Sequence, residues 1–179
     1  MSLRDFFIAS NSAEIACAYE SLVKALQSSA PTVESWDELE FSFNRLFIGP
    51  DLISAPPFAS IYIEEEPYVM GDTTLTVRRL YQMAGLVSPW EGKIPEDHIS
   101  LELDACLNMR TGLLTRYSAH LHDLYGYFLD KHMTRWIPLF IARVDQDPKA
   151  PDTICWVCRK LDEWLNKERE WVDQLPRNG

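Results

Sequence analysis

Residues 95–109 read PEDHISLELDACLNM and are the most informative segment of this chain. Pro95 presets the backbone for the first turn of a helix. The residues that follow are apolar on nearly every side of such a helix: Ile99, Leu101, Leu103, Ala105, Cys106, Leu107 and Met109. A helix that is apolar nearly all round has to be covered by neighbours on every side. The segment therefore predicts a helix at the centre of a bundle.

Apolar residues also recur at helical spacing on both sides of this segment. The pattern predicts further helices at residues 12–26, 36–47, 72–84, 113–130, 136–144 and 154–171. Ser35 and Glu38 have the spacing of a capping box, and Asp72 stands where it can cap the next helix. No two runs alternate like the strands of a hairpin. We therefore expect an all-α fold in which residues 1–179 form a single-domain multi-helix bundle.

Residues 49–68 interrupt the helical pattern. Prolines at positions 50, 56, 57 and 67 bias this segment away from helical conformations. The segment also carries Phe58, Ile61, Tyr62 and Ile63, which make it too apolar for a solvated linker. We predict an ordered loop that lies against the helices and is not a domain boundary.

Charge and hydropathy limit the partners of the chain. Its 179 residues include 17 basic and 27 acidic ones, which gives a net charge of -10. This charge repels a phosphate backbone, so it disfavours nucleic acid as a partner and favours a basic peptide. No segment reaches the roughly 18 to 20 apolar residues of a membrane helix, and residues 1–12 lack the order of a signal peptide. We expect no integral membrane segment and a cytoplasmic location.

The cysteines and histidines do not indicate a catalytic or metal site. Cys155 and Cys158 have the spacing of a dithiol redox motif, but they share a helical stripe with Leu161, Trp164 and Leu165, which favours core packing. None of the four histidines has a second histidine at the i, i+4 spacing that suits a shared metal. There is no nucleophile elbow and no phosphate-binding glycine loop. We expect a protein that is not an enzyme and that holds no cofactor or metal.

Asp97 and His98 stand at the start of the central helix and allow two interpretations. Asp97 can accept hydrogen bonds from the free amides of the first turn, which holds His98 in that turn. The pair is then either an N-cap beside a packed imidazole or a pair of polar groups displayed for binding. The chemistry of the two residues favours neither interpretation over the other.

Four short segments carry a family resemblance. They are FNRLFIGP at 43–50, APPFASIY at 55–62, GDTTL at 71–75 and PEDH at 95–98. In this order and spacing they resemble the TorD/DmsD family of redox-enzyme maturation chaperones. The resemblance is densest between residues 43 and 107 and extends weakly through residues 128–140.

The resemblance implies an all-α chaperone that binds the twin-arginine leader of a molybdopterin-containing reductase subunit and shields the apoenzyme until its cofactor is loaded. Carried over by position, the leader-binding surface comprises Phe43, Leu46, Phe47, Pro56, Phe58, Tyr62, Gly71, Asp97 and His98. These residues form a helix end, an apolar proline loop and a polar helix start, which together suit a peptide groove. Aromatic side chains would receive the apolar part of the leader, and carboxylates would meet its arginine pair.

Three alternatives stay open at this point. A small hydrolase or nucleotide-binding enzyme would use Asp97, His98 and the acidic run at residues 64–66. An assembly chaperone would serve a molybdoenzyme that has no export leader. An oligomeric scaffold would use the apolar loop to form a homodimer or a domain-swapped oligomer.

Overall fold

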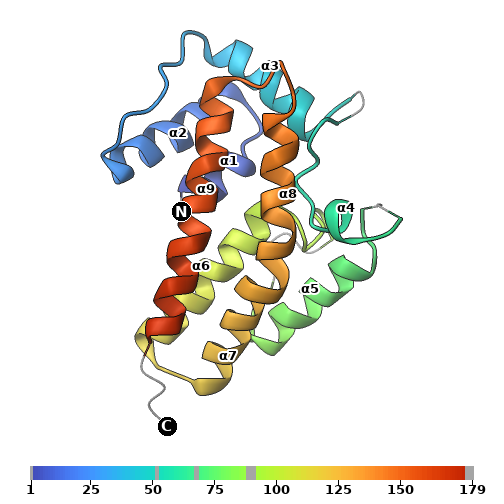
Figure 1. The fold of residues 1–179 in the computed structure, drawn as a ribbon, viewed down its shortest axis with the longest axis vertical. Coiled ribbons are helices and arrows are strands. Elements are labelled where there is room, and N and C mark those ends of the chain that lie inside the picture. Colours follow the sequence, from blue (N-terminus) through green and yellow to red (C-terminus); the bar gives the residue numbers. More distant parts are fainter. Residues whose placement is uncertain (1, 51–52, 67–68, 88–91, 176–179) are drawn as a thin grey trace.

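The computed structural model describes residues 2–50, 53–66, 69–87 and 92–175. Their helices are α1 (Ser2–Phe7), α2 (Ser12–Leu26), α3 (Trp36–Phe47), α4 (Ser60–Ile63), α5 (Asp72–Met83), α6 (Ile99–Thr115), α7 (Ala119–Tyr127), the π-helix η1 (Phe128–Met133), α8 (Thr134–Asp145) and α9 (Asp152–Gln174). No β-strand occurs among these residues, so the predicted all-α fold is confirmed. Figure 1 shows α8 and α9 side by side in front of α6.

Helix α6 forms the predicted centre of the bundle and carries a buried carboxylate. Glu102 is fully buried, and its two oxygens accept from His132 Nε2 at 2.6 Å and from Trp136 Nε1 at 3.0 Å. Burial raises the pKa of Glu102, and the contact with His132 opposes that rise. The network ties α6 to η1 and α8, because a buried carboxylate without such partners would be strongly destabilising.

The helices after α6 differ from their predicted boundaries. We expected one helix over residues 113–130 and another from residue 136, but α6 continues to Thr115 and helical structure then runs without a break from Ala119 to Asp145. The chain turns instead at residues 116–118, where the Ser118 hydroxyl accepts from the amide of Leu121 and caps α7. The π-helix lies where the expected break was placed.

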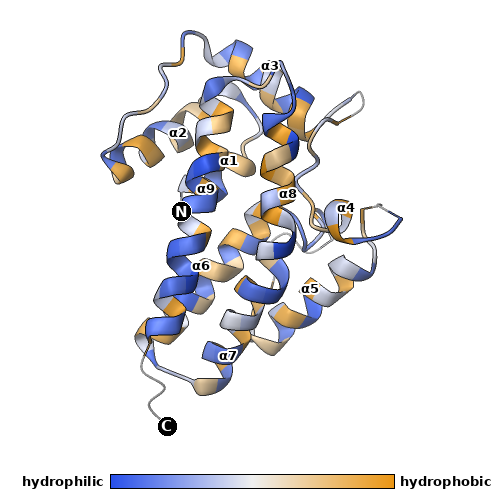
Figure 2. Cartoon of the chain, in the orientation of Figure 1, coloured by the Kyte–Doolittle hydropathy of each residue, from blue (hydrophilic) through white to orange (hydrophobic). Residues whose placement is uncertain are grey.

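The amino-terminal helices pack through an aromatic cluster. Helix α1, which the sequence pattern did not predict, buries Phe6 and Phe7. Phe6 contacts Phe43 edge to face at 5.5 Å, and Phe7 contacts Phe47 at 5.8 Å. Figure 2 shows hydrophobic residues recurring on α2, α3 and α8, whereas hydrophilic residues follow the visible face of α9. The Ser35 cap of α3 is confirmed, since its hydroxyl accepts from the amide of Glu38 at 3.3 Å.

The four cysteines are free thiols in different environments. Cys106 and Cys158 are buried, Cys155 is half-buried and Cys17 is exposed. Burial raises the pKa of Cys106 and of Cys158 well above the usual thiol value. Within the described ranges, no group of three or more His, Cys, Asp and Glu side chains could hold a metal ion. None of the described helices is long and apolar enough to cross a membrane.

Thiol reactivity should follow this burial. We expect a thiol reagent such as DTNB to modify Cys17 rapidly in the native protein, because the thiolate is the reactive form and the buried thiols remain protonated. Cys155 should react more slowly, and Cys106 and Cys158 only after denaturation. Absorbance during the reaction measures the rates, with Cys17→Ser as the control that removes the fast phase. If two thiols of Cys17→Ser still react rapidly in the native protein, the placement of Cys155 and Cys158 in the core is contradicted.

Candidate functional site

Three of the four segments that carry the family resemblance are joined by backbone hydrogen bonds, and the third, at residues 71–75, joins them through the Thr74 side chain. The Ala55 amide donates to the Leu46 carbonyl at 2.8 Å, which links the first two segments. The Ala59 amide donates to the Asp97 carbonyl, and the Ile99 amide donates to the Pro57 carbonyl, both at 3.0 Å. These two bonds flank an isolated antiparallel bridge between Phe58 and His98. The resemblance therefore follows one folded unit around the start of α6.

The carboxylate of Asp97 holds this unit together. It is fully buried, and it accepts from the Ser60 amide at 2.9 Å and from the Thr74 hydroxyl at 2.7 Å. The predicted role of Asp97 as the cap of the central helix is therefore wrong, because the carboxylate reaches the first turns of α4 and α5 instead. Both of its oxygens have partners inside the protein.

The neighbouring Glu96 adds two contacts to α5. Its carboxylate accepts from Nε and from a terminal nitrogen of Arg78 at 2.7 and 2.9 Å, a bidentate ion pair. Its carbonyl accepts from the Tyr81 hydroxyl at 2.9 Å. Residues 96 and 97 thus attach α5 to the start of α6 at three points along the helix.

His98 is the residue that caps α6. Its Nδ1 accepts from the Ser100 amide at 3.2 Å and lies 2.7 Å from the Ser100 hydroxyl. Because Nδ1 accepts from an amide, the imidazole is neutral in this arrangement. Burial lowers the pKa of His98 to about 4, and the charge of Asp97 only partly opposes this shift. The ring also meets Phe58 edge to face at 4.9 Å. These contacts correspond to the packed, capping interpretation of the imidazole.

Gly71 has a structural reason to lack a side chain. It precedes α5 as the N-cap residue, and a Cβ atom at this position would overlap the carboxylate of Glu64. That carboxylate accepts from the Thr73 amide at 2.8 Å and so takes the capping role. The predicted cap at Asp72 is wrong, since Asp72 is already the first residue of the helix.

The remaining predicted leader-binding residues fall into two groups. Phe43, Leu46 and Phe47 are buried in the core at 1%, 0% and 3% exposure, so a leader would reach them only if this packing opened. Pro56, Phe58 and Tyr62 are half-buried. The Tyr62 ring stacks on Trp136 at 5.9 Å and also contacts Phe140. The role of all nine residues in leader binding stays a prediction.

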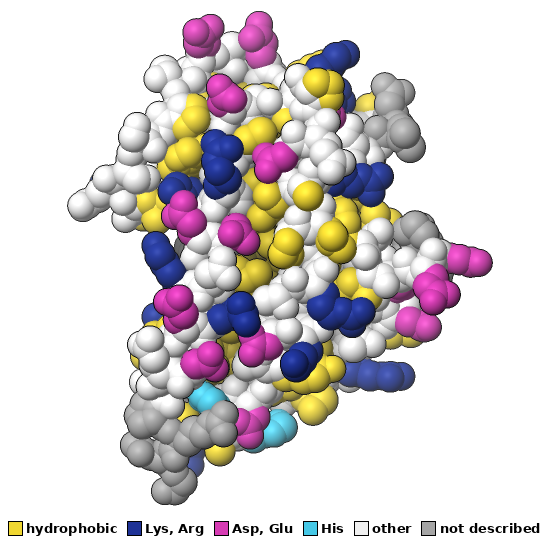
Figure 3. All heavy atoms as spheres, viewed as in Figure 1, with side chains coloured by type: hydrophobic (Ala, Val, Ile, Leu, Met, Phe, Trp, Pro, Cys, Tyr) yellow, Lys and Arg dark blue, Asp and Glu magenta, His cyan; other side chains and the backbone are white. Residues whose placement is uncertain are grey.

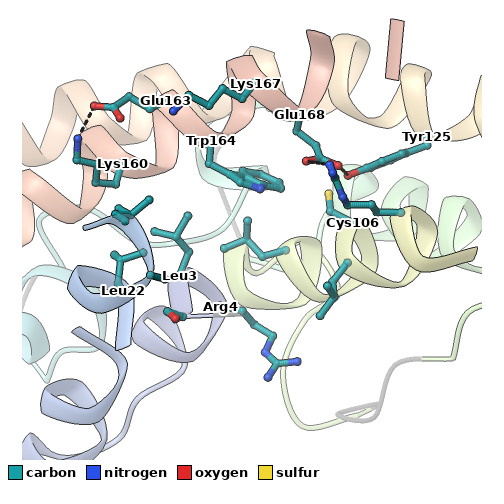
Figure 4. Close-up of a pocket in the computed structure, with 16 residues that line it drawn as sticks. Leu3, Arg4, Leu22, Cys106, Tyr125, Lys160, Glu163, Trp164, Lys167 and Glu168 are labelled. Atoms are coloured by element: carbon teal, nitrogen blue, oxygen red, sulfur yellow. Dashed lines mark hydrogen bonds and ion pairs between the residues drawn. The ribbon is translucent and has the colours of Figure 1, made fainter. Parts of the chain in front are cut away.

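A second region that the sequence did not indicate is a pocket between α1, α2, α6 and α9, with Tyr125 of α7 also in its wall (Figure 4). Its volume is about 260 Å³. Its lining combines an apolar interior with charged side chains: Leu3, Leu22, Leu26, Leu103, Leu107 and Trp164 with Arg4, Arg110, Lys160, Glu163, Lys167 and Glu168. The pocket contains none of the nine predicted residues. No periodic pattern could have found it, because each helix supplies only a few of its walls.

The fold is that of a redox-enzyme maturation protein. The crystal structure of a putative redox enzyme maturation protein from Archaeoglobus fulgidus superposes with a TM-score of 0.52 over 97% of this chain and 91% of that chain, at 20% sequence identity. Residues 9–142 match the family described as nitrate reductase delta subunit, and the chain belongs to this family. The predicted resemblance to the TorD/DmsD chaperones is confirmed.

Two groups of relatives carry chaperone names. The Tat proofreading chaperone DmsD of Salmonella typhi is 29% identical over 109 residues, which are 60% of this chain and 49% of that protein. The chaperone protein TorD of Vibrio parahaemolyticus is 28% identical over 134 residues, 72% of this chain and 62% of that protein. The chain thus spans about half the length of the DmsD proteins that it matches.

Removing the Asp97 carboxylate should lower the free energy of unfolding of the protein. Asp97→Ala leaves the Ser60 amide and the Thr74 hydroxyl buried without an acceptor, and each orphaned donor costs about 1 to 3 kcal/mol. We expect a loss of about 2 to 5 kcal/mol in the free energy of unfolding, measured with urea. Asp72→Ala, which removes an exposed carboxylate nearby, is the control and should change stability by about 0.5 kcal/mol. Equal stabilities of the two variants would contradict the role assigned to Asp97.

His98→Asn should remove a pH dependence of stability. In the folded protein the pKa of His98 is about 4, whereas an unfolded histidine titrates near 6.5, so the unfolded state binds more protons between these values. Stability then falls as the pH drops from 6.5 to 4, by about 3 kcal/mol from this residue. Asparagine keeps an oxygen that can cap α6 but does not titrate.

Urea unfolding of parent and His98→Asn at pH 7 and at pH 4.5 measures this effect. The difference between the two proteins isolates His98 from groups such as Glu102, whose raised pKa acts in the opposite direction. Identical pH slopes would show that the imidazole is not held neutral by burial.

Proposed function

We propose that this protein is a chaperone for a molybdopterin-containing reductase subunit of the DMSO or TMAO reductase type. In this role it binds the twin-arginine leader, the apo form of the subunit, or both, until the cofactor is inserted and the subunit is exported. The observation that carries the proposal is membership of the family over residues 9–142, together with the Tat proofreading and TorD chaperones among the relatives. Loading before export places the proposed activity in the cytoplasm.

The chemistry of the chain supports a basic ligand. A net charge of -10 attracts a peptide that carries adjacent arginines, and this attraction accelerates encounter more than it tightens the final complex. The apolar part of a leader requires an apolar depression, and the helices supply one of about 260 Å³. Half-buried Pro56, Phe58 and Tyr62 offer further contact area at the loop before α5.

The fold occupies three of the residues on which the enzyme alternative depended, Asp97, His98 and Glu64. Asp97 uses both carboxylate oxygens for Ser60 and Thr74, and His98 uses Nδ1 for the cap of α6. Glu64 of the acidic run accepts from the Thr73 amide at the start of α5. We therefore propose binding without turnover.

Leader binding can be tested with synthetic peptides. The probe is a labelled peptide with two adjacent arginines followed by an apolar stretch, and its control has the same composition with the arginines separated and the apolar residues dispersed. We expect fluorescence anisotropy to show tighter binding of the first peptide and weaker binding as salt is added. Replacing both arginines with glutamine should weaken binding by about tenfold, since exposed ion pairs contribute about 1 kcal/mol or less each.

A protein that binds neither the leader peptide nor the purified apo form of any molybdopterin-containing reductase subunit would contradict the proposed function. Binding of an apo subunit without its leader would support the alternative client, a molybdoenzyme that has no export signal.

A further inference from the structure

The groove between α8 and α9 combines an apolar floor with acidic walls. Its lining is Pro138, Ile141, Ala142, Asp145, Arg159, Asp162 and Glu163, and its volume is about 460 Å³. Three carboxylates thus face one guanidinium. Glu163 is paired with Lys160 at 2.7 Å, whereas Asp145 and Asp162 form no salt bridge within the described part of the chain. Figure 3 shows the apolar side chains that gather between these two helices, with acidic groups beside them.

The apolar pocket of Figure 4 also lies against α9, and its α9 residues include Lys160, Trp164 and Lys167, whereas Arg159 and Asp162 line the groove. Glu163 lines both depressions, so the groove and the pocket meet at this residue. In Figure 4, Trp164 points from α9 into the pocket, while Leu3 and Leu22 lie across from it. Leu26 is 41% exposed at this site, an apolar side chain that water still reaches.

We propose that these two depressions form one bipartite docking site for the twin-arginine leader, an inference that rests on the proposed function. The arginine pair binds in the groove, near Asp145 and Asp162, and the apolar stretch enters the pocket beside Leu26 and Trp164. The leader crosses α9 at Glu163. In the leader a basic pair is followed by an apolar stretch. In the protein the acidic groove is followed, across α9, by the apolar pocket.

The distribution of charge sets the direction of the leader. Arg4, Arg110, Lys160 and Lys167 all line the apolar pocket, so a second pair of guanidinium groups is disfavoured there. Arg4, Arg110 and Lys160 are ion-paired, whereas Lys167 has no partner among the described residues. The arginines of the leader therefore belong in the groove.

The spacing also suits a short peptide. A helix with its side chains is about 10 to 12 Å across, and an extended chain advances about 3.3 Å per residue. About three or four residues would therefore separate the arginine pair from the first apolar residue in the pocket.

The predicted surface offers a weaker position for the arginines. Asp97, the carboxylate expected to meet them, is fully buried and has both oxygens occupied. The exposed carboxylates nearest to that surface are those of Glu65, Glu66 and Asp72, which precede or begin α5. They provide an alternative position for the arginines of the leader. Replacing two carboxylates removes the same charge at either position, so the two positions can be compared directly.

The test compares one pair of variants matched in charge and one pair matched in exposure. Asp145→Asn/Asp162→Asn and Glu65→Gln/Glu66→Gln each remove two negative charges, one pair in the groove and one at the predicted surface. Leu26→Ser and Leu75→Ser each polarise a leucine that is 41% or 43% exposed, in the pocket or near the predicted surface. Circular dichroism and melting temperature confirm that all four variants fold like the parent.

We expect the groove variant to bind the labelled leader peptide about fivefold to tenfold more weakly than the Glu65→Gln/Glu66→Gln control. Leu26→Ser should weaken binding about fivefold relative to Leu75→Ser. A peptide without arginines tests which depression binds the arginine pair and which binds the apolar stretch. With glutamines in place of its arginines, the groove variant and the parent should bind equally, whereas Leu26→Ser should still bind more weakly.

Two outcomes contradict the inference in different ways. If the parent binds the leader peptide but the groove variant and Leu26→Ser bind as tightly as it does, the docking site is wrong and the proposed function stands. If the parent binds neither the leader nor an apo subunit, the proposed function fails and the docking site fails with it.

Discussion

The arrangement of the helices depends on one buried carboxylate. Asp97 accepts from the Ser60 amide and the Thr74 hydroxyl, and these two bonds bring the first turns of α4 and α5 against the start of α6. A buried carboxylate requires such partners, because removing its charge from water without replacing the lost hydrogen bonds has a large free-energy cost. The loop before α5 is therefore ordered by a polar interaction and not by apolar contact alone.

A second buried carboxylate, that of Glu102, lies in the first turns of α6 itself. Glu102 connects α6 to η1 and α8 through His132 and Trp136. The stack of Tyr62 on Trp136 then extends this network to α4. The two acidic residues at the centre of the molecule are thus occupied by the fold. Carboxylates that can receive an external arginine have to be sought on the surface, which directs attention to the groove beside α9.

The family resemblance has a physical meaning in this chain. Its segments are joined by hydrogen bonds between Ala55 and Leu46 and between residues 57–60 and residues 97–99, and Gly71 leaves room for the carboxylate that caps α5. A resemblance of this kind reports how the scaffold is assembled. It identifies the class of protein more directly than it identifies the surface that touches a client, because buried residues maintain the shape on which any surface depends.

Local rules determined much of this protein from the sequence alone. The apolar circumference of residues 99–109 predicted the central helix, and Ser35 predicted the start of α3, because helical periodicity and capping act within a few residues. The partners of Asp97 were not predictable in this way, since Ser60 and Thr74 lie 37 and 23 residues away along the chain. The same holds for the apolar pocket, whose walls come from five helices and exist only once those helices have packed. Tertiary structure therefore decided which polar residues serve the fold and which remain available to bind.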